Sequence, residues 1–134
     1  MPLPMPKRNL HSKEIYKQLY KEMGRILRAF FYAFEGVKSA WRSEVAFRLE
    51  LLAVVLAIPL ALFITQEKSA RAVLVASVIL VLIVEIINTA IETIINRISS
   101  EIHPLSKLAK DLASGAVLLA IINAVIVWAV VLWP

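Results

Sequence analysis

Polar side chains interrupt the second of three long apolar stretches in this chain. Drawn as a helix with about 100° per residue, four of them fall within an arc of about 80°: Glu85, Asn88, Glu92 and Asn96. An ionisable side chain near the centre of a membrane helix costs about 2.5 to 3.5 kcal/mol on insertion scales. Two carboxylates on one face therefore favour a functional site over polar contact between helices, which is the alternative.

Phosphoryl transfer is the chemistry that this polar stripe suits. Carboxylates hold Mg²⁺ together with phosphate oxygens, and a further carboxylate can accept the proton of an alcohol. Glu85 lies one to two turns deeper in the apolar stretch than Glu92. We therefore expect Glu85 to be the proton acceptor.

Further charged and polar residues stand where the first and third apolar stretches begin. Glu44 and Arg48 precede the first stretch, and Lys110, Asp111 and Ser114 precede the third. For Glu44 with Arg48 the alternative is a surface salt bridge, and for Lys110 with Asp111 it is an interfacial anchor. A shared site is favoured because all three apolar stretches bring charged residues to the same level of the membrane. The chain has no cysteine and no G-x-x-x-x-G-K-[ST] loop, so any nucleotide must be bound by side chains, and thiol chemistry is excluded.

The elements that position these residues are membrane helices. The chain has 134 residues, 60% of them hydrophobic, and a mean hydropathy of +0.76, which excludes a soluble Rossmann or TIM-barrel enzyme. Three apolar blocks predict an all-α membrane protein with spans at about 45–65, 72–95 and 112–133. The polar runs 65–71 and 96–111 are expected to be the loops between them.

The amino-terminal part of the chain is basic. Residues 1–48 carry ten Lys or Arg against four Glu. Residues 1–11 are predicted to be disordered, and 12–41 to form an amphipathic surface helix, broken near Gly24 or Gly36, on the cytoplasmic leaflet. The alternative, a nucleic-acid-binding arm, is disfavoured because the helix leads into a span, so no nucleic-acid partner is expected. Residues 12–134 then form one domain, with the amino terminus cytoplasmic and the carboxyl terminus outside.

Two segments carry a resemblance to a known family. They are E-I-I-N-T-A-I-E at 85–92, with S-E-I-H-P-L-S-K-L-A-K-D-L-A-S-G-A-V-L at 100–118, and W-R-S-E-V-A-F-R-L-E at 41–50. From about Arg25 onward, the chain resembles the prokaryotic diacylglycerol kinase and undecaprenol kinase family. The resemblance implies a three-span homotrimer in the bacterial cytoplasmic (inner) membrane, which transfers the γ-phosphoryl group of MgATP to a lipid alcohol.

The same resemblance implies residue roles. Glu85 is the implied proton acceptor, Asn88 a neighbour that positions the site, and Glu44 and Glu92 the implied metal ligands. The implied ATP contacts are Arg25, Tyr32, Glu44, Glu92, Glu101, Ile102, His103, Lys110 and Asp111. The implied lipid contacts are Arg25, Ala29, Phe30, Phe31, Tyr32, Ala33, Phe34, Lys38, Ser39, Ala40, Trp41, Ala46, Phe47, Arg48, Leu49, Glu50, Glu85 and Ser114.

The lipid substrate is the point on which alternatives stay open. Asn96, Leu49 and Ala33 depart from residues frequent in the family, yet the E-x-A-F-R form at 44–48 resembles the diacylglycerol branch. We expect phosphorylation of diacylglycerol to phosphatidic acid, with undecaprenol as the alternative lipid. A cation channel or proton-coupled transporter subunit, or a regulatory membrane peptide, is the alternative from another class. A conducting path is disfavoured because residues 72–84 contain Ser77 as their only polar residue.

Overall fold

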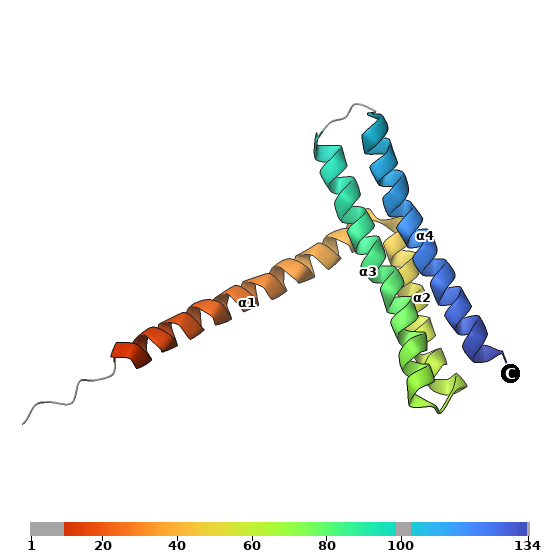
Figure 1. Cartoon of the computed structure of the whole chain (residues 1–134), viewed down its shortest axis with the longest axis horizontal. Coiled ribbons are helices and arrows are strands. Elements are labelled where there is room, and N and C mark those ends of the chain that lie inside the picture. The colour runs from red at the N-terminus through yellow and green to blue at the C-terminus, as the bar shows by residue number, and fades with distance from the viewer. Residues whose placement is uncertain (1–9, 99–102, 134) are drawn as a thin grey trace, which may run out of the picture. The chain divides into compact units, whose positions relative to one another are not determined.

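The computed structural model describes residues 10–98 and 103–133, with side chains from Lys13 onward, and the regular structure in these ranges is entirely α-helical (Figure 1). The helices are α1 (Leu10–Ser43), α2 (Val45–Ile64), α3 (Lys68–Ile98) and α4 (Pro104–Leu132). The chain divides into two compact units, Met1–Lys38 and Ser39–Pro134. We call the described parts of these units the arm (residues 10–38) and the membrane unit (residues 39–98 and 103–133). The prediction of an all-α chain is confirmed.

Helix α1 is continuous, and the predicted break near Gly24 or Gly36 is wrong. Neither glycine adopts a positive φ, so neither provides the left-handed turn that ends a helix. A glycine inside a helix costs about 1 kcal/mol relative to alanine. In a helix of 34 residues, the many residues with a higher helix propensity offset this cost. The helix also begins before residue 12, where the sequence pattern placed its start.

A single residue separates α1 from α2. Glu44 has φ −108° and ψ 120°, an extended conformation, while its backbone N–H still donates to the carbonyl of Ala40 at 2.9 Å. Helix α2 then continues through Pro59 to Ile64. A proline inside a membrane helix is tolerated where neighbouring groups satisfy the freed carbonyl.

The turn between α2 and α3 comprises residues 65–67 and is shorter than the predicted loop 65–71. Arg71 accounts for the difference. Its guanidinium donates to the carbonyl of Thr65 at 2.6 Å and to that of Leu62 at 2.9 Å, so it satisfies carbonyls that the end of α2 leaves without helical partners. The first turn of α3 therefore includes residues that the hydropathy pattern had assigned to the loop.

The predicted loop 96–111 is also too long, because α3 extends to Ile98 and α4 begins at Pro104. His103 is the N-cap of α4, and its Nδ1 accepts a hydrogen bond from the backbone N–H of Leu105 at 3.2 Å. Pro104 occupies the first helical position, where its missing N–H costs nothing. Hydropathy locates the apolar part of a helix, whereas these helices continue through polar residues beyond it.

Helix α3 packs against both α2 and α4. The side of α4 that is buried carries alanines (Ala113, Ala120 and Ala124), and two of them form a core cluster with Val81 of α3. Small side chains allow close helix approach, which matters in a membrane because lipid tails compete equally well for apolar contacts.

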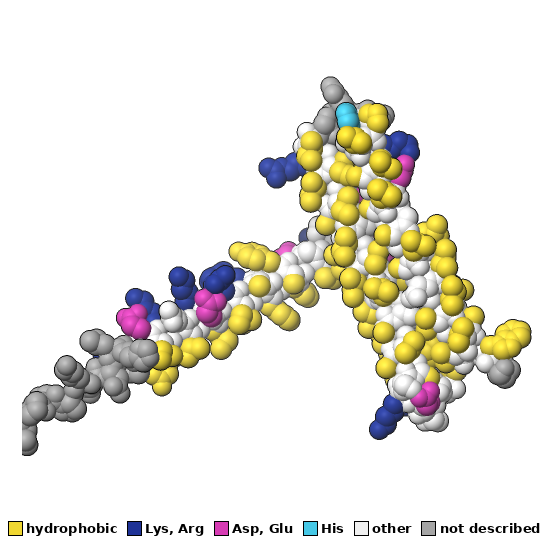
Figure 2. Space-filling model, viewed as in Figure 1, with side chains coloured by type: hydrophobic (Ala, Val, Ile, Leu, Met, Phe, Trp, Pro, Cys, Tyr) yellow, Lys and Arg dark blue, Asp and Glu magenta, His cyan; other side chains and the backbone are white. Residues whose placement is uncertain are grey.

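The three helices of the membrane unit are long and apolar enough to span a membrane. Apolar side chains cover their outer surfaces, and charged groups gather near their ends (Figure 2). In the most apolar window of each helix, only 17 to 22% of the residues are buried. Lipid or further protein must cover the remainder, so the chain is a multi-pass membrane protein with three candidate spans.

Candidate functional site

Glu85 is the starting point of the site. Among the described residues it is the one charged side chain that is fully buried, with 3% of its surface exposed. It lies in the middle of α3, and its Oε2 accepts a hydrogen bond from Asn88 Nδ2 at 3.5 Å, one helical turn away. The polar stripe on α3 thus faces into the membrane unit at Glu85, where burial excludes water from the carboxylate.

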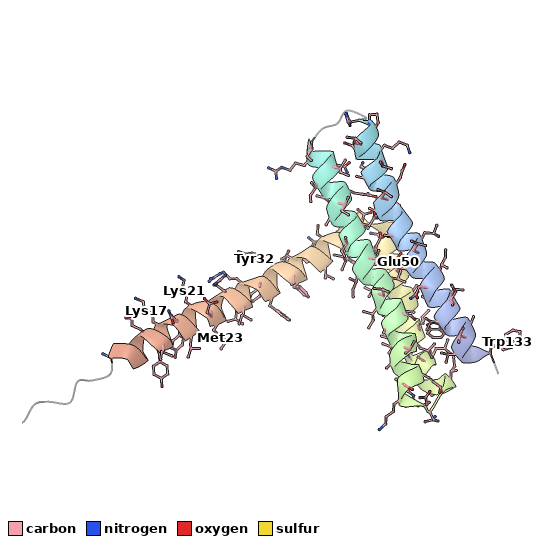
Figure 3. The ribbon with its side chains drawn as sticks, in the orientation of Figure 1. Lys17, Lys21, Met23, Tyr32, Glu50 and Trp133 are labelled. Atoms are coloured by element: carbon pink, nitrogen blue, oxygen red, sulfur yellow. The ribbon has the colours of Figure 1, made fainter. Side chains whose placement is uncertain are left out.

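Three further carboxylates belong to the same region. The charges of Glu44 and Glu92 act on Glu85, and the charge of Glu85 acts on Glu50. Glu50, labelled in Figure 3, is half-buried on α2. Their charges interact with that of Glu85, but the described residues contain no cluster of three or more such side chains that could hold a metal alone.

The sequence had assigned Glu50 to lipid contact and had not connected it with Glu85. The signal that was available is its position: Glu50 is an acidic residue next to the apolar block 51–64, on the helix that follows Glu44. The pairing of α2 with α3 that brings the two carboxylates together is not visible in the sequence of either helix alone.

Three buried oxygen atoms have no hydrogen-bond partner within the described part of the chain. They are Glu50 Oε2, Asn88 Oδ1 and Thr89 Oγ1, and they come from α2 and from the polar side of α3. A buried polar atom without a partner costs about 1 to 3 kcal/mol, and native structures contain few of them. Each of these oxygen atoms has a lone pair available to a hydrogen-bond donor or a cation.

A second polar group lies where α3 ends and α4 begins. Lys110 Nζ donates to Asn96 Oδ1 at 2.6 Å, which links residues 14 apart in sequence, and Asp111 forms an ion pair with Lys107. The structure therefore joins Asn96, the last residue of the predicted stripe, to the predicted nucleotide contact Lys110. Lys107 had not been predicted, although its spacing of four residues from Asp111 is typical of a helical ion pair.

The junction of α1 and α2 holds several other predicted residues. Arg48 Nη1 donates to the carbonyls of Trp41 at 3.1 Å and Arg42 at 3.4 Å, so the i,i+4 spacing with Glu44 does not produce an ion pair. Glu44 occupies the N-cap position of α2, and its side chain makes no capping hydrogen bond. Its carboxylate is thus available to bind a ligand rather than to stabilise the helix.

The remaining predicted residues vary in their surroundings. Ala40 and Phe47 are 3% and 2% exposed, so the chain itself buries these two predicted lipid contacts. Leu49 is exposed and Ser114 lies on the surface of α4, while Ala46 and Ser39 are exposed near the helix junction. Glu101 and Ile102 lie outside the described residues.

Predicted site residues on the arm form a group of their own. They are Arg25, Ala29, Phe30, Phe31, Tyr32, Ala33, Phe34 and Lys38. Arg25 Nη1 forms an ion pair with Glu22 at 3.1 Å, and the aromatic side chains are exposed along the helix. Their assignment to the ATP or lipid site remains a prediction.

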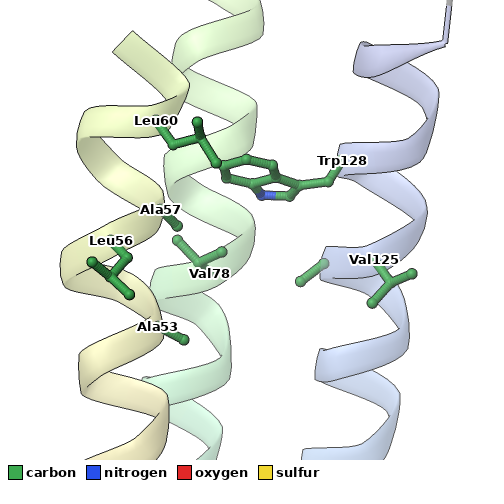
Figure 4. A pocket seen from close by; sticks show the side chains of 8 residues that line it. Ala53, Leu56, Ala57, Leu60, Val78, Val125 and Trp128 are labelled. Carbon is green, nitrogen blue, oxygen red and sulfur yellow. The ribbon is translucent and has the colours of Figure 1, made fainter. Parts of the chain in front are cut away.

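An open apolar groove lies between helices of the membrane unit, and the residues that line it include none of the polar site. Side chains of α2, α3 and α4 line this groove, which has a volume of about 430 Å³, and Trp128 extends from α4 across its end (Figure 4). The indole N–H donates to the carbonyl of Leu74 at 3.3 Å, and the hydroxyl of Ser77 donates to the same carbonyl at 2.8 Å. Ser77, the polar residue in this apolar part of α3, is buried and its hydroxyl is used in that hydrogen bond.

The donor atoms of the site suit a hard cation. Glu44 and Glu92 supply carboxylate oxygens, and the unpartnered Oδ1 of Asn88 is an amide oxygen; Mg²⁺ prefers such ligands. The described residues contain no group of three or more His, Cys, Asp or Glu side chains that could enclose a metal alone. Mg²⁺ at this site would therefore need oxygen atoms of a substrate phosphate in addition to one or two of these carboxylates.

The fold and the site define a class: an all-helical, multi-pass membrane protein with a buried glutamate in one of its candidate spans. Residues 31–132 match the family described as prokaryotic diacylglycerol kinase. The chain is 50% identical over 109 residues to the diacylglycerol kinase of Escherichia coli (strain K12), covering 81% of this chain and 89% of that one. It is 43% identical over 108 residues to that of Pseudomonas aeruginosa (81% and 88% covered) and 37% identical over 117 residues to that of Haemophilus influenzae (86% and 99% covered).

The chain therefore belongs to the prokaryotic diacylglycerol kinase family. The family resemblance predicted from the motifs at 41–50, 85–92 and 100–118 is confirmed, and with it the prediction of a lipid kinase in the membrane.

Proposed function

We propose that this chain phosphorylates diacylglycerol to phosphatidic acid with MgATP, at the cytoplasmic face of the bacterial inner membrane, and that Glu85 is the proton acceptor. The observation that carries the assignment of Glu85 is its burial in the middle of a candidate span, where Asn88 donates a hydrogen bond to it and the charges of other carboxylates interact with it. A lipid alcohol reaches a site at this depth without leaving the membrane.

The chemical step is in-line displacement at phosphorus. The hydroxyl oxygen of the lipid forms a bond to the γ-phosphorus of ATP, the bond from that phosphorus to the β,γ-bridging oxygen breaks, and ADP leaves. Glu85 takes the hydroxyl proton, and Asn88 holds the carboxylate through the hydrogen bond to Oε2. General-base catalysis of this kind typically contributes about 10² to 10⁴ in rate.

Glu44 and Glu92 would hold the Mg²⁺ that accompanies ATP. The ion supplies charge neutralisation to the transferring phosphoryl group when it is bound. Glu44 suits this role because its side chain is not used to cap α2, and Glu92 suits it because it lies on the same face of α3 as Glu85.

Lys110 would bind phosphate oxygens of ATP. Its ammonium group carries three donors, and the hydrogen bond to Asn96 uses one of them. His103 and Asp111 lie at the same end of α4, in keeping with the nucleotide contacts that the family resemblance implies.

Three copies of the chain would form the working assembly. At most 22% of the most apolar window of any candidate span is buried, so identical neighbours with closed cyclic symmetry offer a way to cover the polar stripe. We further propose that the sites lie at subunit contacts, with the arm of one copy completing the site of another. The excess of Lys and Arg before the first span supports the further proposal of a cytoplasmic amino terminus and an outside carboxyl terminus.

The direct test of activity uses purified protein in detergent with γ-labelled ATP, Mg²⁺ and a panel of lipid alcohols that includes diacylglycerol and undecaprenol. We expect label in phosphatidic acid in the presence of diacylglycerol. A preference for undecaprenol would refute the substrate assignment, and a lack of label in every lipid would refute the kinase assignment.

Subunit sharing has its own test. Co-reconstitution of inactive Glu85→Gln with inactive Arg25→Ala should restore some activity, because a mixed trimer then contains a site free of both changes. The control crosslinks the two variants to show that mixed assemblies form. If crosslinked mixed assemblies form but show no activity, each site lies within one chain. A monomeric mass for the active protein would refute the proposed trimer.

A further inference from the structure

The passage from α1 into α2 is a single extended residue, Glu44, which is held from both sides. Before it, the carbonyl of Ala40 accepts a hydrogen bond from the backbone N–H of Glu44 at 2.9 Å. After it, the guanidinium of Arg48 reaches back, and its Nη1 donates to the carbonyls of Trp41 at 3.1 Å and Arg42 at 3.4 Å. All of these residues belong to one compact unit, the membrane unit.

The two carbonyls that Arg48 contacts lie in the last turn of α1. The last four carbonyls of a helix lack N–H partners in their own helix, and a cation near that end also interacts favourably with the helix dipole. Arg48 meets both needs from the first turn of α2. Ala40 and Phe47, which flank the junction in sequence, are 3% and 2% exposed. The backbone around Glu44 is therefore fixed by contacts that do not involve its own carboxylate.

The carboxylate of Glu44 does not use the two partners that its position offers. It makes no capping hydrogen bond on α2, and within the described part of the chain it forms no ion pair with Arg48. The guanidinium is directed at backbone oxygens instead. An arginine paired with Glu44 would compete with a metal ion for the carboxylate oxygens, whereas an arginine that holds the neighbouring backbone leaves these oxygens open.

We propose that Arg48 is a positioning residue for the metal site: it holds the last turn of α1 and thereby fixes the backbone from which Glu44 extends toward Mg²⁺. This inference rests on the proposed function, in which Glu44 is a metal ligand. It gives Arg48 a role other than the lipid contact that the family resemblance implies. The two roles are separable, because a lipid contact acts on the KM for the lipid and a positioning residue acts on the metal requirement.

The sign of the effect separates positioning from simple electrostatics. A positive charge near a metal site repels Mg²⁺, so removal of the guanidinium charge alone would lower the Mg²⁺ concentration for half-maximal activity. Loss of the two backbone contacts acts in the opposite direction, because groups that orient a metal ligand typically contribute about 10- to 100-fold in metal affinity or activity. We expect Arg48→Ala to raise the Mg²⁺ requirement about tenfold, at the lower end of that range, since substrate phosphates also hold the ion.

The first measurement titrates Mg²⁺ at fixed ATP, with the full chain in lipid nanodiscs, and determines the KM for the lipid in parallel. Arg48→Ala should raise the Mg²⁺ requirement and leave the lipid KM unchanged. Arg48→Lys keeps the charge and can donate to one of the two carbonyls, so it should give a smaller increase, and it decides the test if the alanine variant does not fold. The matched control is Arg42→Ala, which removes the same charge from the same junction and keeps the backbone carbonyl; its Mg²⁺ requirement should not rise.

The second measurement does not use activity. Residue-resolved amide hydrogen exchange, recorded without ATP, reports how often the backbone opens locally. The amide of Glu44, bonded to the carbonyl of Ala40, should exchange faster in Arg48→Ala than in the original chain. Exchange at the same amide should be unchanged in the control Arg42→Ala.

A double variant completes the test. If Arg48 acts through Glu44, Arg48→Ala should add no further increase in the Mg²⁺ requirement when Glu44→Ala is already present. A raised lipid KM with an unchanged Mg²⁺ requirement would overturn the positioning role and make Arg48 a lipid contact, and unchanged exchange at Glu44 would overturn it as well. An unchanged Mg²⁺ requirement in Glu44→Ala alone would instead refute the proposed ligand role of Glu44, and with it the role of Arg48 at the metal site, whereas the exchange data would still show whether Arg48 holds the backbone.

Discussion

Replacement of Glu85 by glutamine separates its chemical role from its structural one. Glutamine has nearly the size of glutamate, which matters at a position that is only 3% exposed. Its Oε1 can still accept the hydrogen bond that Asn88 Nδ2 donates at 3.5 Å. The amide cannot take a proton from an alcohol, so the variant removes general-base chemistry and keeps the packing.

Activity and stability should respond in different ways. Loss of a general base lowers kcat by about 10² to 10⁴, which corresponds to about 2.7 to 5.4 kcal/mol in the activation free energy. Stability should be unchanged or higher, because the variant no longer buries a carboxylate near Glu44, Glu50 and Glu92. A misfolded protein would lose both quantities together.

The assay measures kcat with labelled ATP and diacylglycerol at saturating Mg²⁺, together with ATP affinity and detergent-based unfolding. Two controls carry the same substitution: Glu67→Gln, in the exposed turn before α3, should match the original chain, and Glu50→Gln should alter the lipid KM more than kcat. Glu85→Gln with more than about a third of the original kcat would refute the reasoning, since a general base contributes about 10² or more. A larger kcat loss in Glu50→Gln would transfer the role to that neighbour.

Three further outcomes are expected. Glu44→Ala and Glu92→Ala should each raise the Mg²⁺ concentration for half-maximal activity in a titration at fixed ATP, and an unchanged requirement in both would show that neither is a ligand. Asn96→Asp gives Lys110 a charged partner at the site of the 2.6 Å contact, and this carboxylate competes with the phosphates of ATP for the ammonium group. The KM for ATP should therefore rise up to about fivefold with kcat retained. An unchanged KM would show that Lys110 does not bind the nucleotide. Trp128→Phe removes the hydrogen bond between α4 and α3 and should cost about 0.6 kcal/mol in reversible unfolding, with activity retained; a loss several times larger would show that packing dominates there.

The sequence was a good guide to features that depend on one helix. The spacing of Glu85, Asn88 and Glu92 predicts a shared face, because helical geometry alone places residues three and four apart together. The three spans follow from apolar length, and the motifs predicted the family before any geometry was known. The limits of the helices were less accurate: Arg71 and His103 stabilise helix ends inside runs that hydropathy assigns to loops.

Features that depend on two helices were not predictable in this way. The proximity of Glu50 to Glu85 and the hydrogen bond from Lys110 to Asn96 both require the packing of α3 against its neighbours. Hydrophobic periodicity does not determine that packing in a membrane, because both lipid and protein accept an apolar surface. The bond from Trp128 to the carbonyl of Leu74 has the same origin, since a backbone acceptor leaves no mark in the sequence.

The unequal lengths of α2 and α3 have a consequence for the membrane in which the enzyme works. The 20 residues of α2 span about 30 Å, which matches an average hydrocarbon core, whereas the 31 residues of α3 span about 46 Å from the same turn. Measured along α3 from Lys68, Glu85 lies at about 26 Å and Glu92 at about 36 Å, so an average hydrocarbon core of about 30 Å that begins at Lys68 would end between them. Bilayer thickness would then set the boundary between the carboxylate that stays in the apolar layer and the one that meets water. With the proposed roles of Glu85 and Glu92, a thinner membrane would expose Glu85 to hydration and a thicker one would draw Glu92 inward, so that activity would depend on hydrophobic mismatch.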